Sequence, residues 1–253
     1  MENNTNKFTN KAENYNKYRL NYSLEILNHL YDYNFSRNSI IADIGSGTGK
    51  LTRIFLENGN IVYAVEPNEN MRNMAVNTLN EFNNFINING SAEVTTLQDK
   101  SIDFIVVGQA FHWFDTQKSL EEFKRIIKNN GVLTLIWYNR KTNSSFMHDY
   151  EDFLKNNFPN YNEKKHRDIS GNISDKKIMK HFIKDCKKVN FENIRELDSN
   201  ELFGGFLSAS YSPKNDTNEY FESKIFLEKL FNKYNINNNV TFEYETIMYI
   251  GRI

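Results

Sequence analysis

Cysteine, proline and tryptophan are scarce in this chain of 253 residues, which contains one Cys, three Pro and two Trp. Because Cys186 has no second cysteine to pair with, a disulfide within the chain is excluded. No Cys and His residues stand at zinc-binding spacing, so we expect no bound metal. A lone thiol is typical of proteins kept in a reducing compartment.

Long apolar runs and an excess of charge of one sign are also missing. Residues 1–10 lack the apolar stretch of a signal peptide, and no window approaches the roughly 18 apolar residues of a membrane span. We therefore expect a cytoplasmic protein with no membrane partner. The formal net charge of -1 gives no overall field that attracts nucleic acid, so none is expected as a partner. The short basic run at 164–167 is interpreted as a solvated loop.

Short apolar runs rich in β-branched residues recur through about the first 140 residues, with helical patterns between them. Such runs predict parallel strands that are covered on both faces. Their alternation with helices predicts a doubly wound α/β sheet. The expected strands are 40–42, 61–65, 85–88, 104–107 and 132–136, and the expected helices are 22–33, 51–58, 68–82 and 116–128.

The pattern changes after Tyr138. Residues 139–188 are polar, with apolar residues at helical spacing between 146 and 154, and we expect them to form a helical insertion or lid over the ligand edge of the sheet. The tail predicts a helix at 220–234 and a long strand at 240–250, antiparallel to a mostly parallel sheet. We predict one domain, 1–253, comprising an N-terminal helical cap at 1–38, a core at 39–138, the insertion at 139–188 and sheet completion at 189–253.

Three glycines, Gly45, Gly47 and Gly49, lie between the first expected strand and the helix that follows it. Glycine permits the dihedral angles of a tight turn and lets a ligand approach the backbone closely. The spacing is Gly-x-Gly-x-Gly, and Lys50 stands where the dinucleotide fingerprint has its third glycine. We interpret the segment as a cofactor-binding loop, with an ordinary turn as the alternative.

The second expected strand ends in Val65-Glu66-Pro67. In a doubly wound sheet this position brings Glu66 to the carboxyl edge, beside the glycine loop. A carboxylate there can accept hydrogen bonds from both ribose hydroxyls, so an adenosine-containing cofactor is indicated. The alternative is a solvated glutamate at the end of a strand.

Four segments in order resemble the motifs of class I S-adenosylmethionine-dependent methyltransferases, in particular a small-molecule subgroup similar to methyltransferase type 11. The resemblance implies a Rossmann-like fold and methyl transfer from S-adenosyl-L-methionine, with S-adenosyl-L-homocysteine as product. The acceptor is expected to be a small molecule, attacked in line at the sulfonium methyl. The segments are 42–49, 65–71, 90–93 and 103–114, and 15–22 and 249–253 are also similar to that subgroup.

The resemblance also implies which residues hold the cofactor. Asp43 and the glycine loop are expected to bind the methionine portion, Glu66 the ribose, and Met71 is expected to pack against adenine. Ser91 stands where many members have an acidic residue, and Glu93 is the candidate substitute. The predicted cofactor-binding residues are Tyr18, Arg19, Asp43, Gly45, Ser46, Gly47, Thr48, Gly49, Glu66, Pro67, Met71, Ser91, Ala92, Glu93, Gln109 and Ala110.

Methyl transfer from a sulfonium needs no metal or covalent intermediate, because the methyl group is already electrophilic. The protein must place the nucleophile in line and exclude water. His112 is the candidate general base, since it follows the fourth strand at the ligand edge and imidazole has a pKa of about 6.5. Its aromatic neighbours favour a structural role instead. Trp113 and Phe114 are expected to form an apolar wall around the sulfonium.

The candidates for contact with the acceptor are Trp113, Phe114, Arg140 and Tyr211. Arg140 ends the fifth expected strand and indicates an anionic acceptor, with a surface salt bridge as the alternative. Tyr211 is a candidate for the same pocket, with core packing as the alternative. The acidic and histidine residues of the helix at 146–154 are interpreted as a solvated charged face rather than as metal ligands. They are His148, Asp149, Glu151 and Asp152.

Two other functions compete with methyl transfer. An NAD-dependent oxidoreductase is suggested by the glycine loop and Glu66, although Lys50 and the segment from Gly90 to Phe114 argue against it. A non-catalytic adenosyl-cofactor-binding protein is the other alternative, because no catalytic base is indispensable. The acceptor atom and the oligomeric state do not follow from the sequence.

Overall fold

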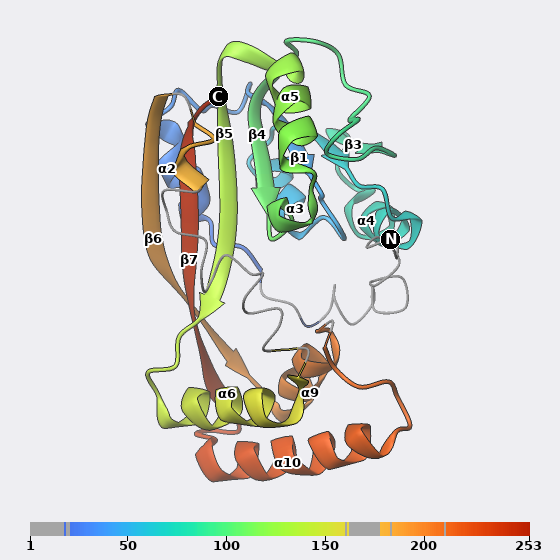
Figure 1. Ribbon diagram of the computed structural model, residues 1–253, viewed down its shortest axis with the longest axis vertical. Coiled ribbons are helices and arrows are strands. Elements are labelled where there is room, and N and C mark those ends of the chain that lie inside the picture. The colour runs from blue at the N-terminus through green and yellow to red at the C-terminus, as the bar shows by residue number, and fades with distance from the viewer. Residues whose placement is uncertain (1–17, 19–20, 160, 162–177, 183, 210) are drawn as a thin grey trace.

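The computed structural model describes residues 18, 21–159, 161, 178–182, 184–209 and 211–253. One seven-stranded sheet runs through the molecule in the order β3-β2-β1-β4-β5-β7-β6 (Figure 1). The first five strands in this order are parallel, and β7 and β6 are antiparallel to their neighbours. The predicted Rossmann-like, mostly parallel sheet is therefore confirmed. The strands are β1 (Ile40–Ile44), β2 (Ile61–Val65), β3 (Phe85–Ile88), β4 (Ile102–Gly108), β5 (Ile127–Arg140), β6 (Lys184–Leu197) and β7 (Val240–Arg252).

Helices cover both faces of the parallel part of the sheet. One face packs Ile41, Val106 and Ile136 against apolar residues of α2, α3 and α4, and the other packs Leu133 and Leu135 against α5. Strands that are buried on both faces read as continuous apolar runs, which is why their positions could be predicted. The helices of this part are α2 (Glu25–Tyr31), α3 (Lys50–Glu57), α4 (Glu69–Leu79), the short 3-10 helix η2 (Phe111–Trp113) and α5 (Thr116–Ile126).

The chain order reverses between β1 and β4, and this reversal positions the site. β1 pairs in parallel with β2 on one side, where Ile44 is opposite Val65, and with β4 on the other, where Asp43 is opposite Val106. The loops after these strands therefore leave the sheet at the same edge. In doubly wound sheets, ligands bind at such a switch point, beyond the carboxyl ends of the strands.

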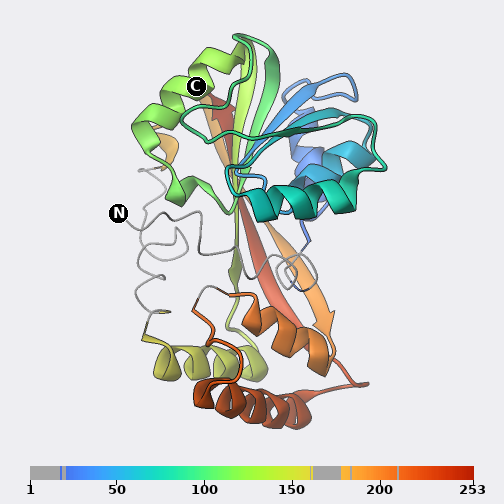
Figure 2. The ribbon, with the colours of Figure 1, turned by 90° about the vertical axis from the view of Figure 1, so that its right-hand side faces the viewer.

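Three long strands, β5, β7 and β6, extend beyond the parallel part of the sheet (Figure 2). β7 pairs with β5 from Leu133 to Arg140 and with β6 over nearly its whole length. The predicted antiparallel strand near the C-terminus corresponds to β7, whereas β6 is a second antiparallel strand that the sequence pattern does not predict. β6 is an edge strand rich in charged residues, and charge on an edge conceals the alternation that marks a strand.

A second layer of helices packs on the far ends of these long strands (Figure 2). It has an apolar core of its own, which includes Tyr150, Phe206, Leu230 and Phe242. The helix expected at 220–234 is present, and this layer draws on residues both before and after β6. Its helices are α6 (Ser145–Asn157), α9 (Ser199–Leu207) and α10 (Asn218–Tyr234).

Element ends differ from the predicted ones where polar residues continue a strand or cap a helix. Helix α5 ends at Ile126 because β5 begins at Ile127, and β5 extends the predicted strand in both directions, up to Arg140. α5 begins after Asp115, whose side chain accepts a hydrogen bond from the backbone N–H of Lys118. Such capping by Asp fixes where a helix begins.

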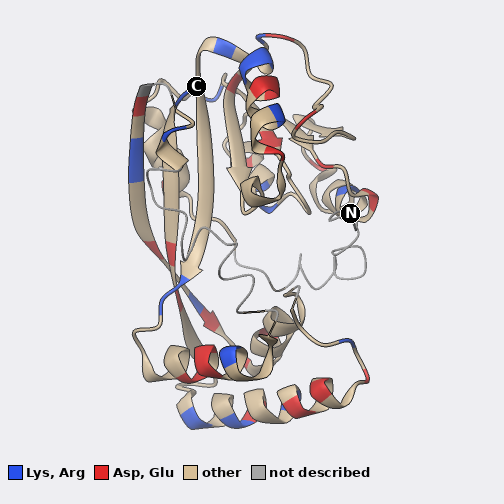
Figure 3. Ribbon diagram, in the orientation of Figure 1, with Lys and Arg blue, Asp and Glu red and all other residues tan. Residues whose placement is uncertain are grey.

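Within the described part of the chain, no helix is both long enough and apolar enough to cross a membrane. Charged residues of both signs occur along each of the helices α5, α6 and α10 (Figure 3). These three helices therefore present no continuous face of one sign.

Candidate functional site

The glycine loop leaves β1 and enters α3 through three glycines in the left-handed region. Their φ angles are +71° at Gly45, +57° at Gly47 and +81° at Gly49, a conformation that favours glycine. A Cβ at Gly45 would lie 2.7 Å from the Cβ of Ala110, and one at Gly49 would touch the side chain of Leu79. At Gly47 a Cβ would meet nothing within 4 Å. The first and last glycines are thus required by packing, whereas Gly47 borders open space.

Asp43, at the end of β1, is buried beneath this loop with an exposed fraction of 1%. Its Oδ2 accepts a hydrogen bond from Thr52 Oγ1 of α3 at 2.6 Å. Burial raises the pKa of Asp43 to about 7, and the nearby Glu66 carboxylate adds to the rise, while the Thr52 bond opposes it. Asp43 therefore ties the loop to α3 and titrates near neutral pH.

Glu66 holds the glycine loop from the neighbouring strand. Its Oε2 accepts a hydrogen bond from the backbone N–H of Gly47 at 3.0 Å, and its Oε1 accepts one from Asn68 N–H at 2.8 Å. Burial raises the pKa of Glu66, and these two N–H groups together with Arg72 counteract the rise. The structure therefore brings Glu66 to the loop, as the sequence predicts, and gives its carboxylate a bond to the loop itself.

A pocket opens between the glycine loop and two tyrosine rings that were not among the predicted site residues. Tyr22 and Tyr138 meet edge to face, with ring centroids 6.0 Å apart, and a Cβ at Gly108 would touch the Tyr22 hydroxyl. Tyr22 lies in the segment 15–22, which is similar to the methyltransferase subgroup. That similarity is the signal in the sequence that could have identified Tyr22 as a site residue. The pocket is lined by Tyr22, Asp43, Gly45, Ser46, Gly47, Thr48, Lys50, Leu51, Gly108 and Tyr138.

The polar and aromatic groups around this pocket suit parts of S-adenosylmethionine. The Oγ1 of Thr48 is buried and has no hydrogen-bond partner among the described residues, so a ligand with polar groups would satisfy it. The carboxylates of Asp43 and Glu66 and the two tyrosine rings suit a ligand that carries hydroxyls and a cation. Lys50 points away toward Asn21, whose Oδ1 accepts its Nζ hydrogen bond at 2.9 Å.

Residues predicted to surround adenine lie on the loops after β2 and β3. Met71, in the first turn of α4, and Ala92 are both 4% exposed. Ser91 Oγ accepts a hydrogen bond from Val94 N–H at 3.3 Å. The carboxylate of Glu93 accepts a bond from Asp115 N–H at 2.9 Å, so it connects this loop to the start of α5. Contacts of these residues and of Pro67 with adenosine stay predictions.

The segment after β4 lies directly against the glycine loop. The Gln109 N–H donates to the carbonyl of Ile136 at 2.9 Å, and its side-chain amide donates to the carbonyl of Tyr138 at 3.3 Å. Ala110 and the ring of Phe114 border Gly45. His112 is half-buried, with its ring centroid 4.9 Å from that of Trp113. The roles predicted for these side chains in binding and catalysis stay predictions.

Arg140, the last residue of β5, is surrounded by tyrosines. Its Nη2 donates to Tyr161 Oη at 2.9 Å, and its Nη1 donates to Tyr211 Oη at 3.5 Å. The guanidinium also lies 5.5 Å from the ring centroids of Tyr150 and Tyr161. The structure thus brings Arg140 and Tyr211 together, as expected for two acceptor-binding candidates, and adds Tyr161.

From the sequence, Glu151 is interpreted as part of a solvated charged face on the helix that corresponds to α6. This interpretation is wrong for Glu151, which is buried. It is 2% exposed, and its carboxylate accepts the Tyr161 hydroxyl at 2.6 and 2.7 Å. Its Oε2 lies 3.7 Å from Arg140 Nε. His148 and Asp152, whose side chains are 65% and 46% exposed, do face solvent. Glu151 lies between Met147 and Leu154 on the apolar stripe of α6, a spacing that was visible in the sequence.

Two predicted residues lie at the N-terminal end of the site. Tyr18 packs its ring against Gly204 of α9, and its carbonyl accepts a hydrogen bond from Arg195 at 2.8 Å. Arg19 lies outside the described residues. Among the described residues, no group of three His, Cys, Asp or Glu side chains could hold a metal ion.

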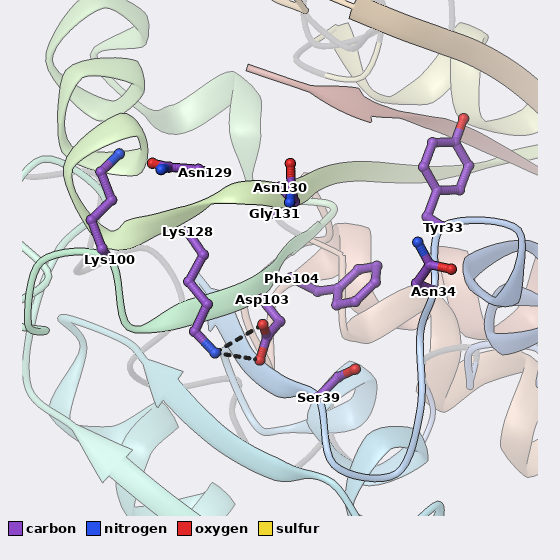
Figure 4. A pocket seen from close by; sticks show the side chains of 10 residues that line it. All are labelled: Tyr33, Asn34, Ser39, Lys100, Asp103, Phe104, Lys128, Asn129, Asn130 and Gly131. Atoms are coloured by element: carbon purple, nitrogen blue, oxygen red, sulfur yellow. Dashed lines mark hydrogen bonds and ion pairs between the residues drawn. The ribbon is translucent and has the colours of Figure 1, made fainter.

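Another hollow lies at the opposite edge of the sheet, where β1, β4 and β5 begin (Figure 4). Two of its charged groups bond each other, since Lys128 Nζ lies 2.9 Å from both carboxylate oxygens of Asp103, while Lys100 Nζ donates to the carbonyl of Lys124. The Asp103 Oδ2 also accepts a hydrogen bond from Ile40 N–H. None of the predicted site residues lines this hollow, so it is separate from the glycine-loop pocket.

Comparison with known proteins bears on the cofactor-binding part of the chain. Residues 42–135 match the family model of a methyltransferase domain. An uncharacterized methyltransferase of Schizosaccharomyces pombe is 34% identical over 132 residues, 51% of each chain. One of Mycobacterium tuberculosis is 36% identical over 100 residues, 40% of each chain. The chain thus matches about half or less of the length of these curated relatives.

The fold is shared over a larger part of the chain. The structure of a putative type II methyltransferase from Anaeromyxobacter dehalogenans has a TM-score of 0.67 to this chain. The two are 17% identical, and the match covers 92% of this chain and 97% of the other. Residues 42–135, which contain the glycine loop, are thus similar to a methyltransferase domain, and the chain shares its fold with the structure from Anaeromyxobacter dehalogenans.

Proposed function

We propose that the protein transfers the methyl group of S-adenosylmethionine to a small-molecule acceptor by in-line displacement at the sulfonium. The observation that carries the proposal is the pocket at the switch point, which Gly47, Tyr22 and Tyr138 line. Gly47 borders open space there, and its backbone N–H is held by Glu66. Bound there, the cofactor supplies an electrophilic methyl group. The chain's part is to hold the cofactor, place the acceptor and exclude water.

The acceptor is proposed to be anionic, and Arg140 supports this. It follows Tyr138 by two residues on β5, so both side chains leave the same face of the sheet. Its guanidinium is fixed by phenolic oxygens rather than extended into solvent, and 22% of the side chain is exposed. A fixed guanidinium beside a cofactor pocket is suited to a carboxylate or a phosphate.

Calorimetric titration with S-adenosylhomocysteine tests the cofactor part of the proposal. We expect saturable binding, reduced about tenfold or more in Gly47→Ala, because the new methyl group enters the space where the ligand lies. Gly59→Ala is the matched control, since Gly59 also has a positive φ of +96° and no atom within 4 Å of a Cβ. Both substitutions strain the backbone, by about 1–2 kcal/mol, but Gly59 lies outside the pocket. The absence of binding to the unsubstituted protein would contradict the proposal.

The alternatives have their own outcomes in the same experiment. Binding of NAD in preference to S-adenosylhomocysteine would favour an oxidoreductase, against which Lys50 argues because it stands where the dinucleotide fingerprint has its third glycine. Binding of S-adenosylhomocysteine without methyl transfer to carboxylates, phenols or amines would favour a non-catalytic binding protein. We place the activity in the cytoplasm, which is suited to the lone thiol of Cys186.

A further inference from the structure

Two hydrogen-bond donors meet beside the cofactor pocket and have capacity left for a ligand. The Arg140 Nη1 reaches Tyr211 Oη only at 3.5 Å, the outer limit of a hydrogen bond. The hydroxyl hydrogen of Tyr211 has no acceptor among the residues that the structure describes. Nη1 of Arg140 and the Tyr211 hydroxyl can therefore both donate to one carboxylate placed between them.

The remaining groups around Arg140 hold it in place and balance its charge. Tyr161 accepts from Arg140 Nη2 and donates to the Glu151 carboxylate, so it bridges the two. Burial raises the pKa of Tyr161, which keeps its hydroxyl neutral. Glu151 is buried 3.7 Å from Arg140 Nε. Arg140 and Glu151 thus form a pair with no net charge, oriented by a neutral phenol.

Arg140 of this pair lies on β5, close along the strand to a residue that lines the cofactor pocket. Tyr138 lines that pocket, and Arg140 is the next residue of β5 on the same face, about 7 Å along the strand. Tyr244, opposite Arg140 on β7, packs its ring 5.7 Å from that of Tyr138. The side chains of Tyr138 and Arg140 therefore leave neighbouring positions on one face of β5. A carboxylate bound by Arg140 would lie on the side of the cofactor pocket that Tyr138 lines.

We propose that the acceptor is a carboxylic acid and that the atom methylated is a carboxylate oxygen, held by Arg140 Nη1 and the Tyr211 hydroxyl. This inference rests on the proposed methyltransferase function. A lone pair of the carboxylate oxygen forms the bond to the methyl carbon, and the carbon–sulfur bond breaks with its electron pair returning to sulfur. The products are a methyl ester and S-adenosylhomocysteine, and no proton is released.

The charges at the site are consistent with this reaction. Because Arg140 and Glu151 balance each other, an incoming carboxylate is balanced by the sulfonium of the cofactor. Methyl transfer turns both into neutral groups, so separated charge disappears in the transition state, which a site of low polarity favours. An ionised carboxylate also needs no general base, so the reaction does not depend on the role of His112.

Transfer of labelled methyl groups to matched pairs of compounds tests the inference. The full chain is incubated with S-adenosyl-L-[methyl-³H]methionine and with benzoate, cinnamate, hexanoate or succinate, each beside its primary amide. We expect label only with the acids, and we expect mild alkali to release it as volatile methanol, as it does from a methyl ester. A pH indicator in weak buffer should show no proton release during turnover.

Two substitutions separate the carboxylate clamp from general effects on the fold. Tyr211→Phe should lower kcat/KM for the best acid about tenfold or more, since a hydrogen bond to a charged group is lost, with binding of S-adenosylhomocysteine unchanged. Tyr31→Phe removes a hydroxyl from a half-exposed ring on α2 and should change neither value. Alkali-stable label, or no label with any acid in a preparation that binds S-adenosylhomocysteine, would overturn the inference. Failure to bind S-adenosylhomocysteine would instead count against the proposed function.

Discussion

At the scale of single residues, Asp43 makes the stability of the unliganded protein depend on pH. Its pKa is about 7 in the folded state, against 3.8 as the ordinary value of an aspartate side chain. Between these values the folded protein binds a proton that the unfolded chain has lost, so the free energy of unfolding falls as the pH rises through this window. The shift corresponds to a few kcal/mol, at about 1.4 kcal/mol for each pKa unit.

Asp43→Asn should therefore make stability less dependent on pH. Urea unfolding at pH 4.5 and pH 8, without cofactor, measures this dependence. Relative to the unsubstituted protein, the variant should gain stability at pH 8 compared with pH 4.5, because Asn cannot ionise in the buried position. Asp152→Asn, on the exposed face of α6, is the control and should leave the difference unchanged. An equal pH dependence in both variants would show that Asp43 does not titrate in this range.

At the scale of elements, α6 carries a buried charge in its apolar face, and the cost of removing it can be measured. Glu151→Leu leaves Arg140 without its balancing carboxylate and removes the acceptor of the Tyr161 hydroxyl. We expect the free energy of unfolding to fall by about 2–4 kcal/mol, since breaking a largely buried ion pair leaves an uncompensated charge.

Urea denaturation measures that loss, and the same helix supplies the control. Asp149→Asn alters a carboxylate that is 36% exposed and bonds Tyr234 and Lys233, so its effect should stay within about 1 kcal/mol. If Glu151→Leu were as stable as the unsubstituted chain, the Arg140–Glu151 pair would contribute nothing to the fold. Glu151→Gln, which keeps the shape and can still accept the Tyr161 hydroxyl, should be intermediate.

The elements show which parts of the fold the sequence predicts and which it does not. β1 and β4 are largely buried on both faces, and β2 is buried except at its first and third residues. Their apolar runs can therefore be recognised from the sequence of each strand alone. β6 depends on β7 for its pairing and carries charges along an edge, so its own residues do not reveal a strand. Tertiary contacts, rather than local preference, decide such elements.

The candidate site likewise has residues whose meeting the sequence predicts and residues whose meeting it does not. The glycine loop and Glu66 lie within about 20 residues of one another and follow strands whose order is set by topology, so their meeting could be predicted. Glu151, Tyr161 and Tyr211 come from separate segments of the helical layer, and only the packing of that layer places them around Arg140. Helical spacing could have shown that Glu151 is buried, but not which residue it contacts.

At the scale of the whole molecule, the cofactor pocket and the residues around the acceptor candidate belong to different cores. Asp43, Glu66 and the glycine loop lie on the parallel part of the sheet, whereas Tyr150, Tyr161 and Tyr211 pack in the apolar core of the helical layer. β5 and β7 connect the two parts (Figure 2). A defect in the helical layer should therefore impair the acceptor side more than cofactor binding.

Phe206→Ala tests this division, because Phe206 is 1% exposed in the helical layer and contacts Phe153 and Phe158. We expect a loss of about 3–5 kcal/mol in the free energy of unfolding, as for other buried phenylalanines. Hydrogen exchange should accelerate in α6, α9 and α10 more than in α3 and α4. Under folding conditions the affinity for S-adenosylhomocysteine should stay within about twofold, while methyl transfer falls. Phe55→Ala, in the core beneath the glycine loop, should instead weaken cofactor binding. Equal effects of the two substitutions on cofactor affinity would mean that the long strands couple the two cores into one unit.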